Sequence, residues 1–255
     1  TNFAISAYKP KLALDYVSPA SIGVGVDRFG TYAAGGISAF WSDMLGTRTI
    51  VTTAFTGSHL VDTSGALGYL NNKGRFNWGA AAQRIVYPYP YYYLYEDEFA
   101  GEPAIFEVQD IYRLINYDLS VFGSYPFSQV SRFSLSTGFR IQDFQRTLYT
   151  RIYSMASGGL IAYEKESVPT PPALAYGYLT AGYYYDTGIF GATSPILGQN
   201  IGLAVSPAIG SINFVTVSAD FRKYFMPLRP FTLAFRALHL GRYGKDAEDN
   251  RFYPL

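Results

Sequence analysis

Few side chains in this sequence could support covalent or metal chemistry. The 255-residue chain has no cysteine, which excludes disulfides, thiolate metal sites and cysteine nucleophiles. It has two histidines, His59 and His239, so a multi-histidine metal centre is not expected. His59 falls in a predicted loop, and the strand pattern places no serine and carboxylate beside His239. Neither histidine is therefore expected to belong to a catalytic triad.

Two other patterns resemble binding motifs but have simpler interpretations. Glu96, Asp97 and Glu98 could bind a divalent cation, yet successive carboxylates are more typical of a solvated loop tip. The glycine pairs at residues 35–36 and 158–159 match no phosphate-binding loop, because neither separates a strand from a helix. We predict that the chain is not an enzyme and that it has no cofactor or metal site.

Charged side chains also occur inside predicted strands. They are Asp118, Arg140, Asp220, Arg222 and Arg236. Asp220 and Arg222 share one face of one strand, and Arg236 lies on the next strand, where it should come within reach of one of them. Opposite charges on neighbouring strands stabilise a sheet. A structural or electrostatic role is therefore predicted for these residues.

The segments that carry these residues show the two-residue period of β-strands. In residues 131–142 one face is polar, and the other carries Phe133, Leu135, Phe139 and Ile141. Residues 214–225 repeat this pattern with Val215, Val217 and Phe221, and residues 231–237 repeat it with Leu233 and Phe235. No stretch shows the 3.6-residue period of an amphipathic helix. The sequence predicts an all-β fold.

Composition narrows the class of all-β protein. The net charge is +1, which gives no electrostatic case for binding nucleic acid. Charged residues make up only 15% and aromatic residues 18%, so the chain has ample apolar area to bury and is not disordered. No apolar run is long enough for a transmembrane helix. These features favour an antiparallel transmembrane β-barrel in the bacterial outer membrane.

In such a barrel one strand face meets lipid and the other meets the lumen. The predicted lipid-facing residues are Phe133, Leu135, Val215, Val217, Phe221 and Leu233. The predicted lumen-facing residues are the five charged residues named above. A soluble β-sandwich would show the same alternation with the two faces exchanged, so alternation alone does not decide between them.

Loop lengths favour the membrane barrel. We predict about eleven strands in a meander, joined alternately by tight turns and by longer loops, as in outer-membrane proteins. The strands centre near Tyr16, Ile37, Val51, Ala66, Ala80, Leu119, Leu135, Leu179, Leu203, Val217 and Phe235. Residues 86–110 and 149–172 are the longest predicted loops, and Pro88 and Pro90 argue against a central strand there. In this alternation the connection at residues 186–199 should be a tight turn, but it is too long for one.

Three short motifs resemble a known family. They are Tyr8–Lys9–Pro10–Lys11–Leu12 at the entry to the first strand, Ser42–Asp43–Met44–Leu45–Gly46 in the first tight turn, and Arg229–Pro230–Phe231–Thr232–Leu233–Ala234–Phe235–Arg236 entering the last strand. Together they resemble the BamA/TamA-like superfamily of bacterial outer-membrane assembly barrels, the bacterial surface antigen family. The resemblance is to the branch with an upstream periplasmic β-propeller.

That resemblance implies a barrel of about sixteen strands, whose first and last strands meet at a weak seam that opens for client proteins. Residues 1–10 would be a linker from an upstream periplasmic region, and residues 11–255 the N-terminal portion of the barrel. The seam strand would contain Leu12, Leu14, Tyr16, Gly23 and Gly25. The family's sixth-loop Arg-Gly-aromatic motif is absent, which suggests a truncated barrel.

Two functions remain open. The first is insertion or translocation of outer-membrane or secreted proteins through a lateral seam. The alternative is a passive channel, or a membrane anchor for a periplasmic domain. In either case the expected partners are outer-membrane lipid and the upstream domain, with client proteins in the first case only. A soluble β-sandwich and an outer-membrane hydrolase are weaker alternatives, because the first does not explain the loops and the second lacks a triad.

Overall fold

The computed structural model describes residues 8–27, 30–57 and 59–251, which form almost only β-strands. The strands are β1 (Ala13–Val17), β2 (Ser21–Asp27), β3 (Gly30–Ser42), β4 (Arg48–Thr56), β5 (Ser64–Asn71), β6 (Asn77–Phe99), β7 (Glu102–Pro126), β8 (Ser131–Ser154), β9 (Leu160–Val168), β10 (Leu174–Asp186), β11 (Ile189–Phe190), β12 (Pro195–Gly210), β13 (Phe214–Leu228) and β14 (Phe231–Tyr243). A short 3-10 helix, η1 (Leu60–Asp62), lies between β4 and β5. In this part of the chain, no helix has the length and apolarity needed to cross a bilayer.

The strands form an antiparallel meander. A continuous hydrogen-bonded path runs β1-β3-β4-β5-β6-β7-β8-β10-β12-β13-β14. Each of the strand centres expected from the sequence falls in a different strand of this path, so the predicted all-β meander is confirmed. Three further strands, β2, β9 and β11, pair beside it with β3, β8 and β12 and bring the total to 14. The sheet is not closed, because the outer sides of β14 and of β1 and β2 have no strand partner among the described residues.

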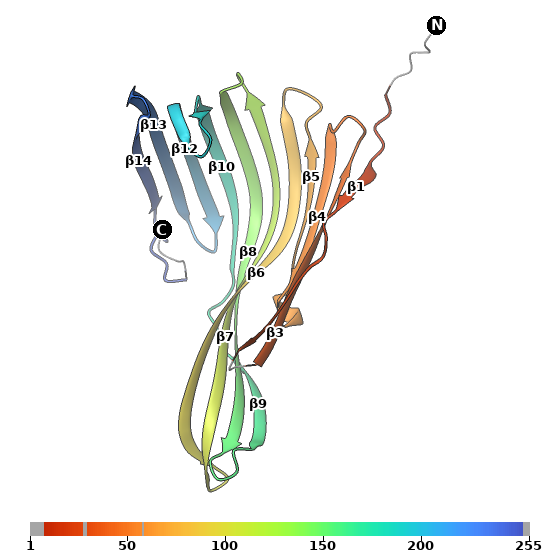
Figure 1. Ribbon diagram of the computed structural model, residues 1–255, viewed down its shortest axis with the longest axis vertical. Coiled ribbons are helices and arrows are strands. Elements are labelled where there is room, and N and C mark those ends of the chain that lie inside the picture. The colour runs from red at the N-terminus through yellow and green to blue at the C-terminus, as the bar shows by residue number, and fades with distance from the viewer. Residues whose placement is uncertain (1–7, 28–29, 58, 252–255) are drawn as a thin grey trace.

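The sheet curves into a trough that narrows to a projection (Figure 1). Strands β6, β7 and β8 are 23, 25 and 24 residues long, so they continue past the trough. We call the projection the finger: residues 86–110 of β6 and β7, residues 143–154 of β8, and β9. Its order is β6-β7-β8-β9. The tight turns β3–β4, β5–β6, β7–β8 and β13–β14 lie at the opposite end of the trough, beside the start of β1 (Figure 1).

The finger corrects the prediction that residues 86–110 and 149–172 are long loops. Both segments are mainly paired strands, with register unbroken from Asn77↔Ser124 to Phe99↔Glu102. β9 pairs with β8 over most of its length, and only residues 169–173 form the proline-rich connection to β10. The prediction failed because these strands are longer than a strand needs to be to cross a bilayer. The residues beyond that length were therefore predicted to be loops.

Pro88 and Pro90 lie in β6, in the part of this strand that forms an edge of the sheet. Pairing of β5 with β6 ends at Gly65↔Arg84, whereas pairing of β6 with β7 continues. The backbone N–H of Val86 points to the β5 side, since it donates to Ser64 Oγ at 3.0 Å. Residues 88 and 90 share the orientation of residue 86, so neither proline removes a hydrogen bond to β7. These prolines block the open edge of the finger against further strands.

The first strand is interrupted, which corrects the expectation of one continuous seam strand. β1 and β2 pair end to end along the same side of β3, and the chain bends between them at residues 18–20. The register also shifts between Leu14 and Tyr16. Leu14 and Tyr16 lie in β1 and are more than half exposed, Leu12 precedes β1, and Gly23 and Gly25 lie in β2. The register shift in β1 leaves a residue unpaired and weakens the ladder there.

The connection at residues 186–199 contains β11, which folds back onto β12, and this accounts for its unexpected length. Residues 1–7 of the predicted linker and residues 252–255 lie outside the described residues. Tyr8 is held in place, because its hydroxyl donates to Asp43 Oδ2 at 2.9 Å.

Candidate functional site

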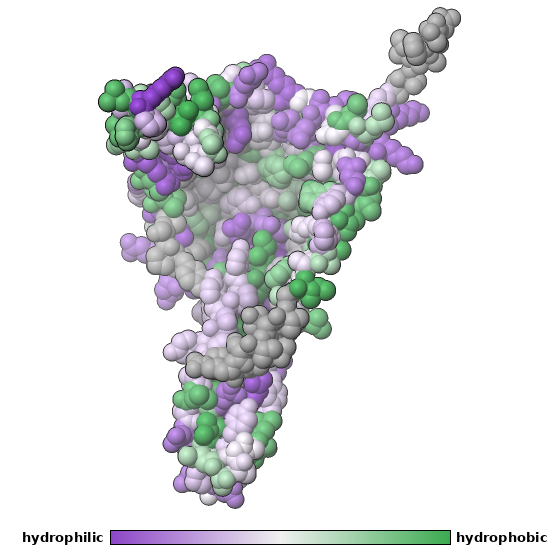
Figure 2. Space-filling view, viewed as in Figure 1, coloured by the Kyte–Doolittle hydropathy of each residue, from purple (hydrophilic) through white to green (hydrophobic). Residues whose placement is uncertain are grey.

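The two faces of the trough differ in chemistry and in burial. Asp118, Gln142 and Tyr176 on the polar face are 6–7% exposed. The alternating positions on the other face carry large apolar side chains that remain widely exposed. Side chains crowd together on the inside of a curved sheet, so the polar face is the concave one. Figure 2 shows the hollow between the two flanks of the trough, with apolar side chains gathered along the flank formed by β3 and β4.

The convex face carries a continuous apolar band. Its large side chains on six strands are 37–65% exposed: Ile37, Leu67, Leu119, Val121, Leu135, Phe139, Ile141, Leu179, Leu203 and Val205. Paired positions such as Leu67↔Ala82, Ala82↔Leu119 and Leu119↔Phe139 place these side chains side by side across the strands. Within the described ranges no second layer covers the band. A soluble sandwich would bury such a face against another sheet.

The height of the band can be followed along β8. Its convex positions from Phe133 to Ile141 are uncharged, and the next such position is Asp143. These nine residues extend about 30 Å at 3.3 Å per residue. At the strand tilt of membrane barrels, about 35–45°, this distance corresponds to a band about 21–24 Å tall, close to the apolar band of about 25 Å that such barrels present to lipid.

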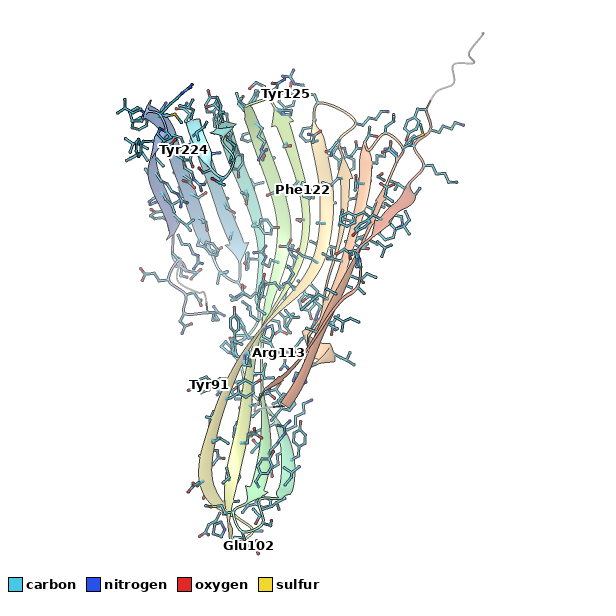
Figure 3. The ribbon with its side chains drawn as sticks, viewed as in Figure 1. Tyr91, Glu102, Arg113, Phe122, Tyr125 and Tyr224 are labelled. Atoms are coloured by element: carbon cyan, nitrogen blue, oxygen red, sulfur yellow. The ribbon has the colours of Figure 1, made fainter. Side chains whose placement is uncertain are left out.

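Aromatic side chains border the band at the tight-turn end. They come from six strands and share the convex face: Trp41, Tyr69, Trp78, Tyr125, Phe133 and Tyr183. Tyr69 and Trp78 meet edge to face at 5.4 Å between ring centroids. Figure 3 shows Tyr125 at this end and Glu102 at the tip of the finger, far from it. Tyrosine and tryptophan in such a row are typical of a lipid headgroup level.

The six predicted lipid-facing residues all lie on this convex face. Phe133, Leu135 and Leu233 are 39%, 45% and 52% exposed. Val215, Val217 and Phe221 are half-buried and pair with convex positions of β12, for example Val217↔Val205. His239 is on the same face, where its Nε2 is 2.8 Å from the hydroxyl of Tyr243. The second histidine, His59, stacks on Tyr149 at 5.0 Å, so both histidines have structural neighbours.

On the concave face, Asp118 is the centre of a cluster drawn from three strands. It lies on β7 and accepts a hydrogen bond from Arg140 Nε of β8 at 2.9 Å. Tyr178 of β10 reaches across β8 and donates its hydroxyl to the Asp118 carboxylate at 3.1 Å. The Arg140 guanidinium also lies over the Tyr178 ring at 5.3 Å. Sequence analysis found Asp118 and Arg140 but missed Tyr178, because nothing in the sequence of β10 indicates that this side chain crosses β8 to reach β7.

A second concave cluster joins the last two strands. Arg222 and Arg236 are directly opposite each other in register, an arrangement that would be repulsive without a counter-ion. Asp220 supplies the counter-ion, since its Oδ2 lies 2.6 Å from Arg222 Nη2 and 2.9 Å from Arg236 Nη2. The predicted contact between Asp220 and Arg236 is therefore confirmed. All five predicted polar residues lie in these two clusters.

The neck between trough and finger has a buried ion pair that sequence analysis did not identify. Arg113 Nε of β7 lies 2.6 Å from Asp62 Oδ1 of η1, and the two residues are 1% and 5% exposed (Figure 3). This pair fastens the β4–β5 connection to the base of the finger. On the concave side the neck is filled by an apolar cluster of Leu114, Phe144, Leu174, Tyr176, Ala208 and Ile212.

The first tight turn is organised by Asp43. Its carboxylate accepts hydrogen bonds from the Arg48 amide at 2.8 Å, from the Thr47 hydroxyl at 2.7 Å and from Tyr8. Burial raises the pKa of this carboxyl group, but these hydrogen bonds outweigh burial and hold the pKa at about 2. The contact with Tyr8 joins two of the three motifs on which the family resemblance depends.

Neither metal binding nor a known relative assigns a function. In residues 8–27, 30–57 and 59–251, no three His, Asp or Glu side chains are grouped so that they could hold a metal ion. Glu96, Asp97 and Glu98 lie in β6 near the tip of the finger. Comparison with family models, with curated proteins and with solved structures found no match.

Proposed function

We propose that this chain forms part of the wall of a β-barrel in the bacterial outer membrane. The uncovered apolar band on the convex face is the observation that carries the proposal. Its height, its lack of charge and its aromatic border fit a lipid bilayer. The concave face, with its ion clusters and hydrogen-bonded tyrosine, would then line the lumen.

Within the membrane, the open edges of the sheet must be paired. Unpaired backbone groups are too costly in hydrocarbon to persist there. Further strands of the same protein, or of another chain, would therefore pair with β14 and with β1 and β2. This requirement is independent of the activity of the barrel.

For the activity, we propose insertion or translocation of client proteins through a lateral seam at the first strand. Three features support this role: the interruption between β1 and β2, the register shift beside Asp15, and the resemblance of three motifs to assembly barrels. A strand that is interrupted and shifted in register holds its neighbour weakly, so its edge can exchange hydrogen bonds with a client strand at low cost. In this role the protein would act without covalent chemistry.

A passive channel or membrane anchor is the second candidate. It is favoured by the ion clusters, because charges on a lumen wall are tolerable when the lumen is filled with water. The two candidates differ at the first strand. A seam requires client contact there, whereas a channel or anchor does not.

Site-specific photo-cross-linking in living cells separates them. We expect a photoreactive residue at Leu14 or Tyr16 to capture client proteins during their assembly. The matched control is the same residue at Leu203, an exposed convex position on β12, which is paired on both sides and lies far from the first strand. Equal capture at all three positions, or none at Leu14 and Tyr16, would argue for the channel or anchor.

A further inference from the structure

The convex face contains a groove along β6. It has a volume of about 520 Å³ and is lined by Leu67, Leu119, Phe139, Ile141 and Ala82 among others. Ala82 is the small residue in its row, flanked by Leu67 on β5 and Leu119 on β7. The small side chain of Ala82 leaves the groove open between these two larger side chains, and the groove runs along the apolar band.

One end of this groove is lined by the cation Arg84. Asp118 also borders the groove, but its carboxylate faces the concave side and is paired with Arg140. Arg84 lies in the next row, between Gly65 and Tyr117. Its guanidinium donates to the backbone oxygens of Val61 and Thr63, and it lies 5.7 Å from the centroid of the Tyr117 ring. These contacts hold the side chain in place, but carbonyl groups and a phenol carry no negative charge. The contacts found for Arg84 therefore fix its position without neutralising it.

We propose that the groove binds an anionic phospholipid, with an acyl chain beside Ala82 and the lipid phosphate at Arg84 and Tyr117. This inference rests on the proposed membrane location. Arg84 lies at the finger-side border of the apolar band, which is the level of the lipid headgroups. Arginine forms charge-assisted hydrogen bonds with phosphate, and the Tyr117 hydroxyl can donate a further hydrogen bond.

A second groove shows what distinguishes this site. It lies on the convex face at the tight-turn end, has a volume of about 420 Å³, and is lined by aromatic residues that include Phe76, Trp78 and Phe133. None of its lining residues is charged. It offers apolar surface without a cation, so it would accept an acyl chain but would not select an anionic headgroup.

Native mass spectrometry of the purified protein in detergent micelles can test the proposal, with phosphatidylglycerol as the probe and phosphatidylcholine as the comparison. We expect wild-type protein to retain phosphatidylglycerol preferentially. Arg84→Gln should bind it about tenfold more weakly, as expected for losing one charge-assisted contact. The control Arg132→Gln removes an arginine that also lies over a tyrosine ring, that of Tyr184, but faces the concave side.

Arg84→Gln could misfold, since Arg84 also anchors the β4–β5 connection. Two further variants therefore test the proposal independently of it. Ala82→Leu keeps the charge and fills the groove, so it should weaken retention, whereas Arg84→Lys should preserve much of it. Equal retention by wild type, Arg84→Gln and Ala82→Leu would overturn the proposal. Displacement of the lipid by inorganic phosphate alone would also overturn it, because the groove would then be unnecessary. Failure of the membrane proposal gives a different result: wild-type protein soluble without detergent and unable to insert into vesicles.

Discussion

The ring of Tyr178 lies directly over Gly138 of the neighbouring strand. A Cβ atom built on Gly138 would come within 2.6 Å of the Tyr178 hydroxyl oxygen and 2.7 Å of the Leu119 carbonyl oxygen. The two residues are paired in register, so the tyrosine can fold across β8 toward Asp118 only because position 138 has no side chain. One glycine thus permits the Asp118 cluster.

We expect Gly138→Ala to destabilise the protein by about 1–3 kcal/mol, as inserted methyl groups do in packed interiors. It should also displace Tyr178 from Asp118. Gly68→Ala is the matched control, because Gly68 lies on the concave face in the same row and a Cβ there meets nothing within 4 Å. The control should be neutral or up to about 0.5–1 kcal/mol more stable. Urea unfolding from lipid vesicles measures both, and equal effects would contradict this role of Gly138.

Val217→Arg tests the apolar band. Val217 is a convex position on β13, opposite Val205, so a charge there should cost about 2–4 kcal/mol if it lies at the bilayer midplane. Ser218→Arg places the same side chain on the concave face of the same strand. We expect folding into vesicles to be impaired only by Val217→Arg. Impairment by Ser218→Arg alone would mean that the faces are assigned the wrong way round.

A double-mutant cycle with Asp220→Asn and Arg236→Gln measures the cross-strand pair between β13 and β14. We expect a coupling energy of about 0.2–1 kcal/mol, the range for opposite charges on neighbouring strands. Asp220→Asn alone should cost more than Arg236→Gln alone, because it leaves Arg222 opposite Arg236 without a counter-ion. Thermal unfolding in detergent gives the four stabilities. A coupling energy of zero would mean that the contact adds nothing to stability.

Asp43 should make the protein sensitive to acid. Its pKa is about 2 in the folded state, below the value of 3.8 for an ordinary aspartate, so the unfolded chain binds more protons. The stabilisation is complete above the unfolded pKa and is lost as the pH falls through the folded pKa. The loss of stability between pH 5 and pH 2 should therefore be smaller in Asp43→Asn than in wild type. Asp249, whose pKa Arg251 also lowers to about 2, titrates in both proteins and cancels in the difference. Identical acid sensitivity of the two proteins would refute the role of Asp43.

The orientation of the barrel can be measured with single cysteines, since the chain has none of its own. Ser157 is exposed at the β8–β9 connection of the finger, and Ser128 is exposed in the tight β7–β8 turn. If the finger projects outside the cell, a membrane-impermeant maleimide should label Ser157→Cys on intact cells. Ser128→Cys should react only after permeabilisation. The reverse labelling would invert the topology.

The sequence by itself determined the class of fold and the chemistry of each face. Alternation in segments such as residues 131–142 is a local property of the strand, so it predicted both the strands and the side of each side chain. The approach of Arg236 to Asp220 could be predicted because a short connection fixes the register of β13 and β14 within narrow limits; in the structure it is the two residues 229–230.

Only the tertiary structure decided the finger, the interruption of the first strand, and the contacts between residues distant in sequence. Pro88 and Pro90 are compatible with a strand only because β5 ends beside them, and nothing in their own segment reveals where β5 ends. Tyr178 reaches Asp118 across an intervening strand at a residue separation of 60, and Asp62 reaches Arg113 at a separation of 51. Such contacts depend on the curvature of the whole sheet, which no single segment encodes.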